Sequence, residues 1–152
     1  MSDNNNILIS IKEINEVSFN LRPLPIPIEQ VKFGENLSVD IGFRFAVDVT
    51  TNTFKFFTTL SYSLSGIEEP VIELEIEMVF DVENISQVVK IDGDESMKIE
   101  DGFVITLAGV CIGTIRGVLA TNIKGNPLSR FPLPIMNPQV IVDEMKRKTE
   151  IR

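Results

Sequence analysis

The fold is decided by residues 37–82, LSVDIGFRFAVDVTTNTFKFFTTLSYSLSGIEEPVIELEIEMVFDV. Three segments of this stretch alternate apolar and polar residues with a period of two, which is typical of strands that bury one face. These segments are 37–49, 53–64 and 71–82. The stretches between them are short enough for hairpin turns. We therefore expect an antiparallel meander of three strands with one apolar and one polar face.

A fourth strand is expected before the meander, at residues 7–19. Ile7, Ile9 and Ile11 share one face there, and a bulge would explain why the apolar residues after them change register. The following stretch, 20–36, contains three prolines, which prevent both a helix and regular strand pairing. It is nevertheless apolar, which is unusual for a loop. It either covers the sheet or forms an apolar wall for a bound chain, and the sequence leaves both open.

The second half of the chain indicates two helices. Residues 84–100 are expected to be a connector with a turn at Asp92 to Asp94, and Asp101 is expected to cap a long helix over about 102–123. After an apolar, proline-rich segment, Asn137 is expected to cap a shorter helix that begins at Pro138 and runs to about Lys148.

These elements predict one α+β domain over residues 1–152. It is a four-stranded antiparallel sheet with an apolar crossover loop after the first strand, followed by a long helix and a shorter C-terminal helix.

The composition narrows the classes of partner and the expected location. The net charge of −8 disfavours nucleic acid and anionic membrane surfaces, because phosphate binding needs clustered Lys and Arg. A single cysteine excludes an intramolecular disulfide and fits a reducing compartment. The first residues do not resemble a signal peptide, and the longest apolar run, 103–115, is interrupted by glycines and shorter than the roughly 18 residues that span a bilayer. We expect a cytoplasmic protein.

The residues that carry most catalytic chemistry are missing or poorly placed. The chain has no histidine, which removes Ser-His-Asp and Cys-His arrangements and the commonest zinc ligand. Cys111 lies in an apolar helical pattern, so we expect a buried thiol. Asp92, Asp94 and Ser96 resemble part of a calcium loop, but Met97 stands where such a loop needs glycine. We therefore expect no catalytic residue, no metal and no cofactor. A carboxylate-based enzyme stays as a rival hypothesis.

Two rows of residues indicate surfaces for other chains. Glutamates at 73, 75 and 77 alternate on one strand and would project together from the polar face. They are either simply solvated or a dock for a basic partner. Glycines at 109, 113 and 117 lie four apart and so line one face of the long helix. They allow close approach either of the sheet or of a helix from another subunit.

The order of elements, together with three short motifs, resembles the SecB-like export chaperones. The motifs are GTIRGVL at 113–119, Lys124-Gly125, and FPLPIMNP at 131–138. The family has a similar helix with an Arg near its middle, a glycine-containing break, and a Leu-Pro-Pro-Ile-Asn-like lead into its last helix. The likeness in order covers nearly the whole chain, and the likeness in residues is concentrated in 113–138.

The resemblance implies an ATP-independent holdase that binds unfolded or pre-secretory polypeptides in apolar grooves. SecB-like proteins are dimers of dimers, with long helices between eight-stranded sheets, and they act in protein transport by passing clients to the SecA motor. Some relatives instead protect antitoxins. The alternative is a non-catalytic structural subunit of a larger assembly. The client, the export or antitoxin role, and the choice between homodimer and homotetramer stay open.

The resemblance also implies positions for the working surfaces. Glu73, Glu75 and Glu77 would be the partner-docking face, and Gly109, Gly113 and Gly117 the oligomer interface. The chain departs from typical members at its end, which is short and basic, KRKTEIR, and not an acidic, zinc-assisted tail for SecA. A role with SecA is thereby left open. The implied client groove is lined by Leu24, Ile26, Ile28, Phe33, Leu133, Ile135, Met136, Val140, Ile141 and Met145.

Overall fold

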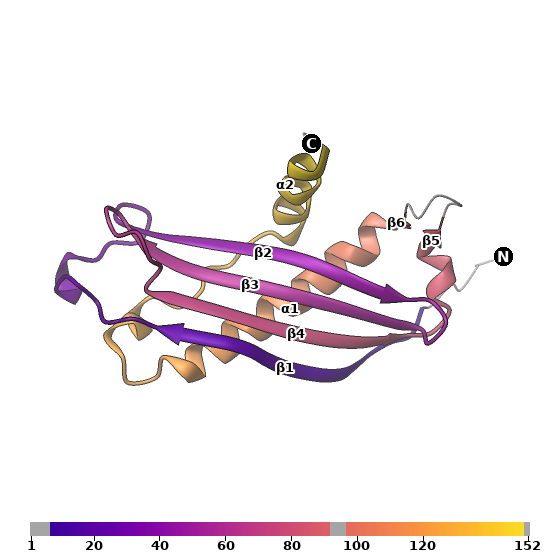
Figure 1. Ribbon diagram of the computed structural model, residues 1–152, viewed down its shortest axis with the longest axis horizontal. Coiled ribbons are helices and arrows are strands. Elements are labelled where there is room, and N and C mark those ends of the chain that lie inside the picture. Colours follow the sequence, from indigo (N-terminus) through magenta and orange to yellow (C-terminus); the bar gives the residue numbers. More distant parts are fainter. Residues whose placement is uncertain (1–6, 92–96, 151–152) are drawn as a thin grey trace.

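The computed structural model describes residues 7–91 and 97–150, with 148–150 described by their backbone only. Its centre is a four-stranded antiparallel sheet in the order β1-β4-β3-β2. The strands are β1 (Ile9–Leu21), β2 (Leu37–Asp48), β3 (Thr53–Leu64) and β4 (Ile72–Val82). Helix α1 (Asp101–Asn122) crosses one face of the sheet, and helix α2 (Pro138–Glu150) lies near β2 (Figure 1). The expected α+β fold is therefore confirmed.

The meander forms where the period of two predicts it. β3 has the predicted bounds, and the hairpins β2–β3 and β3–β4 pair residue by residue without a register shift. β1 begins and ends two residues later than the expected 7–19. It pairs with β4, with register shifts between Ile11 and Glu13 and between Glu16 and Ser18. These shifts confirm the expected bulge. The crossover loop, residues 22–36, then carries the chain from this edge to β2 at the opposite edge.

The core lies between the sheet and α1. β3 and β4 present their apolar alternation toward the helix, and α1 packs across these two strands in return. Phe103 of α1 meets Phe54 of β3 edge to face at 5.3 Å. Cys111 is buried in this layer, which confirms the expected buried thiol, and burial raises the pKa of that thiol to about 12. The buried residues of α1 are Phe103, Val104, Leu107, Ala108, Cys111, Ile112, Ile115 and Leu119.

The ends of the helices agree with the sequence except at Asp101. This residue is the first of α1 and not its cap; the cap position is Glu100, whose side chain makes no capping hydrogen bond. The carboxylate of Asp101 instead pairs with Lys146 of α2. Asn137 does cap α2, since its side chain accepts a hydrogen bond from the backbone N–H of Gln139 at 3.0 Å.

Helix α1 is more apolar over its length than we predicted from the sequence. Its 22 residues include an 18-residue window with mean hydropathy 2.0, which by length and composition is enough to cross a membrane. The expectation that no such segment exists is therefore wrong, because glycine and threonine interrupt the pattern without lowering the mean below that of a span. Core helices pass the same test, and 44% of this window is buried in the structure.

The stretch expected to be a connector contains a small hairpin instead. A 3-10 turn, η2 (Ile85–Gln87), leads into β5 (Val89–Ile91), which pairs antiparallel with β6 (Met97–Ile99). Strands of three residues are too short to show a period, so the sequence could not reveal them. The turn expected at Asp92 to Asp94 lies outside the described residues. Two further 3-10 turns are η1 (Ile28–Gln30) and η3 (Pro127–Arg130).

Candidate functional site

Several apolar side chains of the crossover loop pack against the core. Leu24, Ile26 and Ile28 are half-buried and pack against the core. Phe33 is 38% exposed, and its ring contacts Tyr62 and Phe131 at centroid distances of 6.0 and 6.2 Å. These four predicted groove residues therefore gather at one end of the sheet, where the loop meets the proline-rich segment.

The proline-rich segment is fixed by α1. Arg116 donates from Nε to the carbonyl of Leu133 at 3.0 Å and from Nη2 to the carbonyl of Pro134 at 2.9 Å. Leu133 is only 3% exposed and belongs to the core, so here the structure departs from the predicted groove lining. Ile135 is 97% exposed and lines none of the pockets described below. The Arg116 contacts set the path that leads into α2.

A shallow pocket of about 340 Å³ lies where α2 meets the edge of the sheet. We call it the β2–α2 pocket. It includes Val39 and Ile41, which belong to the inner face of β2, and also Asp40, which belongs to the outer face, so the pocket spans the edge of that strand. Its other lining residues come from the start of α2 and the residues before it: Met136, Asn137, Val140, Ile141 and Glu144.

A second pocket of about 390 Å³ lies on the other side of α2. We call it the hairpin pocket, because β6 forms one of its walls. Its lining is apolar except for a single lysine: Phe45, Met97, Ile99, Val104, Val142, Met145 and Lys146. Of the predicted groove residues, Met145 lies here, whereas Met136, Val140 and Ile141 lie in the β2–α2 pocket.

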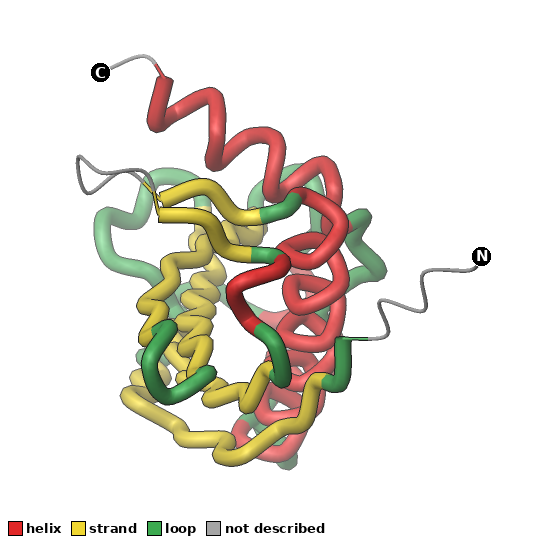
Figure 2. The backbone as a smooth tube through the Cα atoms, turned by 90° about the vertical axis from the view of Figure 1, so that its right-hand side faces the viewer, coloured by secondary structure: helices red, strands yellow, loops and turns green. Residues whose placement is uncertain are grey.

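The position of α2 leaves both pockets open. Within residues 138–147, where side chains are described, only Val142 is fully buried, and Val140 is 52% exposed. The helix extends past β2 beyond the edge of the sheet (Figure 1), and the end-on view shows it at the rim of the two-layer body (Figure 2). α1 packs mainly on β3 and β4, and the inner face of β2 is half-buried from Val39 to Val47.

Several lining residues were not among those predicted. Val39, Ile41 and Phe45 were visible as the apolar face of a strand, but the sequence could not show that this part of the face would stay partly open. Met97 and Ile99 gave no signal, because they belong to the hairpin that the sequence did not reveal.

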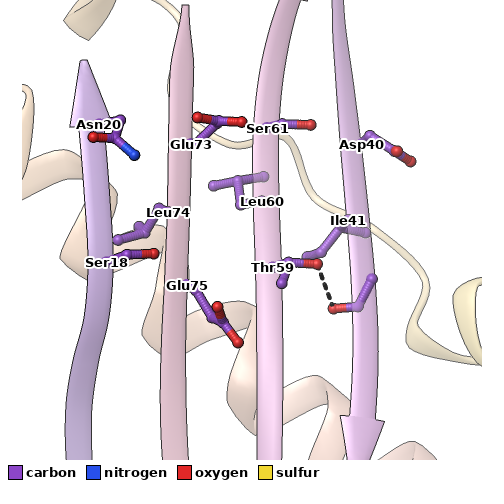
Figure 3. Close-up of a pocket in the computed structure, with 11 residues that line it drawn as sticks. Ser18, Asn20, Asp40, Ile41, Thr59, Leu60, Ser61, Glu73, Leu74 and Glu75 are labelled. Carbon is purple, nitrogen blue, oxygen red and sulfur yellow. Dashed lines mark hydrogen bonds between the residues drawn. The ribbon is translucent and has the colours of Figure 1, made fainter. Parts of the chain in front are cut away.

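The acidic row lies on the outer face, and two of its three glutamates form ion pairs. Glu73 is paired with Arg22 at 2.9 Å, Glu75 with Arg44 at 3.0 Å, and Glu77 accepts a hydrogen bond from Asn15 at 3.1 Å. Figure 3 shows Glu73 and Glu75 beside the hydroxyl and amide groups that line a polar hollow of about 470 Å³. Docking of a basic partner here stays a prediction.

The glycine row does not pack on the sheet. A Cβ at Gly109 would lie 3.6 Å from Pro138 of α2, whereas a Cβ at Gly113 or Gly117 would meet nothing within 4 Å. Gly113 and Gly117 are exposed. The alternative that these glycines permit close approach of the sheet is therefore wrong, and a contact between subunits stays a prediction. Within residues 7–91 and 97–150, no group of three or more His, Cys, Asp or Glu side chains could hold a metal ion.

No protein-family model matches the chain, and no curated protein matches it. Among solved structures, the chain is similar to the SecB-like chaperone Rv1957 of Mycobacterium tuberculosis, which was solved in complex with a ChAD peptide from the Rv1956 HigA1 antitoxin. The match covers 84% of this chain and 90% of that chain, with 17% identity and a TM-score of 0.48. The description of that protein names the same class, SecB-like chaperones, that the sequence motifs resemble.

Proposed function

We propose that the protein binds extended, apolar segments of other polypeptides and holds them without using ATP. The observation that carries this proposal is the half-open apolar surface along β2 and α2, with a pocket on each side of the helix. Each apolar side chain buried there contributes on the order of 1.5–3 kcal/mol. A few such contacts are enough to retain an unfolded segment.

The shape of this surface favours a chain over a small molecule. Small-molecule sites are usually concave and enclose most of their ligand, with a few converging polar groups. The two pockets are instead shallow, lie along one strand, and are separated by a helix. Methionines at 97, 136 and 145 contribute to their walls, and methionine repacks readily around varied partners. This combination suits segments of differing sequence.

The test replaces Met136 and Val140 together by Gln. Both line the β2–α2 pocket and neither is fully buried, so the variant is expected to fold and to lose affinity for an unfolded client by more than about tenfold. The measurement is suppression of client aggregation, with thermal unfolding as a check on folding. Ile135→Gln is the matched control, since Ile135 is almost fully exposed and lines neither pocket. Full suppression by a folded double variant would place client binding elsewhere and refute the proposed site. Wild-type protein that holds no client would favour a structural subunit.

We also propose that the protein assembles as a homodimer or homotetramer. Gly113 and Gly117 are exposed on α1, and a Cβ built at either would meet nothing within 4 Å, so the helix surface is low at these two positions. On the same side of the sheet, Ile11 and Ile14 of β1 are 49% and 51% exposed. Exposed apolar residues beside a smooth helix face are typical of a subunit contact.

A further inference from the structure

Ile135 is the most exposed large apolar residue of the described chain, at 97%. The backbone around it is nevertheless held in place. Before it, Arg116 donates to the carbonyls of Leu133 and Pro134 at 3.0 and 2.9 Å. After it, the side chain of Asn137 caps α2. A single exposed apolar residue is ordinary on a protein surface, but one presented from a fixed backbone loses little freedom on binding and can act as an anchor.

The β2–α2 pocket lies next to this anchor. Its lining includes Met136, the residue that directly follows Ile135, and continues to Val140 and Ile141 on α2. Ile135 itself does not line the pocket, and at 97% exposure its side chain touches almost nothing of its own chain. An unfilled apolar pocket and an apolar side chain without a partner surface therefore share a border.

The charges beside the anchor and the pocket are complementary. Arg116 is half-buried, is bound to the carbonyl directly before Ile135, and forms no ion pair within the part of the chain that the structure describes. Asp40 and Glu144 line the pocket, both are exposed, and neither has an ion pair with a described residue. A positive charge beside the anchor thus matches two negative charges beside the pocket.

An anchor and a pocket that adjoin each other suit a two-fold contact. In such a contact residue i of one copy meets residue j of the other, and residue j meets residue i in return. Because the anchor and the pocket share a border, the two-fold axis can pass between them, and one rotation then fills both pockets. The contact closes with two chains and does not continue into a fibre.

We propose that a second copy of the chain closes the β2–α2 pocket, with Ile135 of each protomer seated in the pocket of the other and Arg116 beside the partner's Asp40 or the partner's Glu144. This inference rests on the proposed function, which assigns the same pocket to clients. It is a different contact from the one proposed for α1. A client and a second copy then compete for one pocket, so the protein inhibits itself when it is concentrated and is opened by its clients.

Disulfide trapping between two different variants tests the contact. Tagged Ile135→Cys is mixed with untagged Val140→Cys under mild oxidation, and non-reducing electrophoresis measures the mixed dimer. The natural Cys111 is buried and takes no part. In the matched control, Gln139→Cys replaces Val140→Cys, because Gln139 is adjacent and exposed but does not line the pocket. Since a disulfide needs close Cα atoms, the Val140 pair should give at least about tenfold more mixed dimer than the control pair. Equal yields would overturn the contact.

Competition with an unfolded client tests the self-inhibition. Excess client should lower the yield of mixed dimer by about threefold or more. The wild type should hold clients less tightly as its own concentration rises. Ile135→Gln should match the wild type when both are dilute and hold clients at least about threefold more tightly when both are concentrated. Client holding by the wild type that does not depend on its concentration would overturn the self-inhibition.

The charge pairing is tested by Glu144→Lys, introduced into both members of the trapping pair. It should lower the yield of mixed dimer by about threefold or more at low salt. Asp143→Lys is the matched control, because Asp143 is the adjacent exposed acid on α2 and does not line the pocket. An equal response of both variants would mean that only net charge matters, and would overturn the assigned partner of Arg116.

The outcomes separate this inference from the proposed function. If the trapping pair gives no excess of mixed dimer while clients are still held, the contact is wrong and the proposed function stands. If the mixed dimer forms but the protein holds no client at any concentration, the contact stands and the proposed function is wrong. If neither is seen, both fail.

Discussion

The β1 and β2 sides of this sheet show how one layer can offer two unlike surfaces. On the β1 side, a bulged strand exposes Ile11 and Ile14 on the same side of the sheet as α1, and α1 itself exposes Gly113 and Gly117. On the β2 side, a regular strand is flanked by two pockets and overhung by α2. The first surface is where we propose contact with an identical subunit, and the second, half-open surface is where we propose client binding. The two proposals thus assign assembly and client binding to edges that differ in strand geometry, although both edges expose apolar residues.

The largest effect on the β2 side alone is expected from Arg116→Met. This change removes two hydrogen bonds to the carbonyls of Leu133 and Pro134 and so frees the segment that positions α2. Hydrogen bonds to a charged donor contribute about 1.5–3 kcal/mol each. We expect lower thermal stability and at least about tenfold weaker client binding, with assembly through α1 unchanged. Arg130→Met, at an exposed position on η3, is the control. Client binding that survives in folded Arg116→Met would show that α2 is not held by this contact.

The β1 side is tested by Gly113→Leu. A Cβ built at this exposed glycine meets nothing within 4 Å beyond its own stretch of helix, so we expect the monomer to keep its stability. At a tight contact between subunits the added volume costs roughly 1–3 kcal/mol. The variant oligomer should therefore dissociate at a higher protein concentration than the wild-type oligomer does. Light scattering over a concentration series measures this. A wild-type protein that is monomeric at micromolar concentration would refute the assembly proposal.

The smallest effect is expected on the outer face, which belongs to neither side. Glu75→Lys combined with Glu77→Lys removes the pairing with Arg44 and the contact with Asn15, at a cost of up to about 1 kcal/mol because these groups are partly exposed. If the acidic row docks basic partners, binding of an oligolysine probe should weaken and lose its salt dependence, while client holding stays intact. Unchanged oligolysine binding would show that the acidic row does not dock basic partners and is simply solvated.

The sequence predicted best where the pattern is local and the period is strong. The bounds of β3 are those expected, and Asn137 caps α2 as expected, because alternation and capping depend on a few neighbouring residues. The prediction for Asp101 was wrong although its signal is also local. The signal indicates a helix cap, but the carboxylate of Asp101 pairs with Lys146, which belongs to a helix distant in sequence.

The site was harder to predict because it depends on how elements pack. No pattern in the sequence shows that α1 covers β3 and β4 and leaves the inner face of β2 half-buried from Val39 to Val47. The prediction from sequence therefore named Leu133, which is core, and passed over Ile41 and Phe45, which line the pockets. The placement of α2 rests on Arg116 contacts that join residues 17 and 18 positions apart, a spacing that no periodic pattern reveals.

The crossover loop also has a consequence for the way this chain folds. The meander closes through hairpins of a few residues, but β1 must find β4 across a span such as that between Arg22 and Glu73, which are 51 positions apart. Closing a loop about ten times longer costs roughly 2 kcal/mol more in chain entropy. β1 is therefore the strand whose pairing is the costliest to nucleate, on a sheet whose other three strands assemble from neighbours. The chain completes its own sheet by laying an extended strand along a waiting edge, β4.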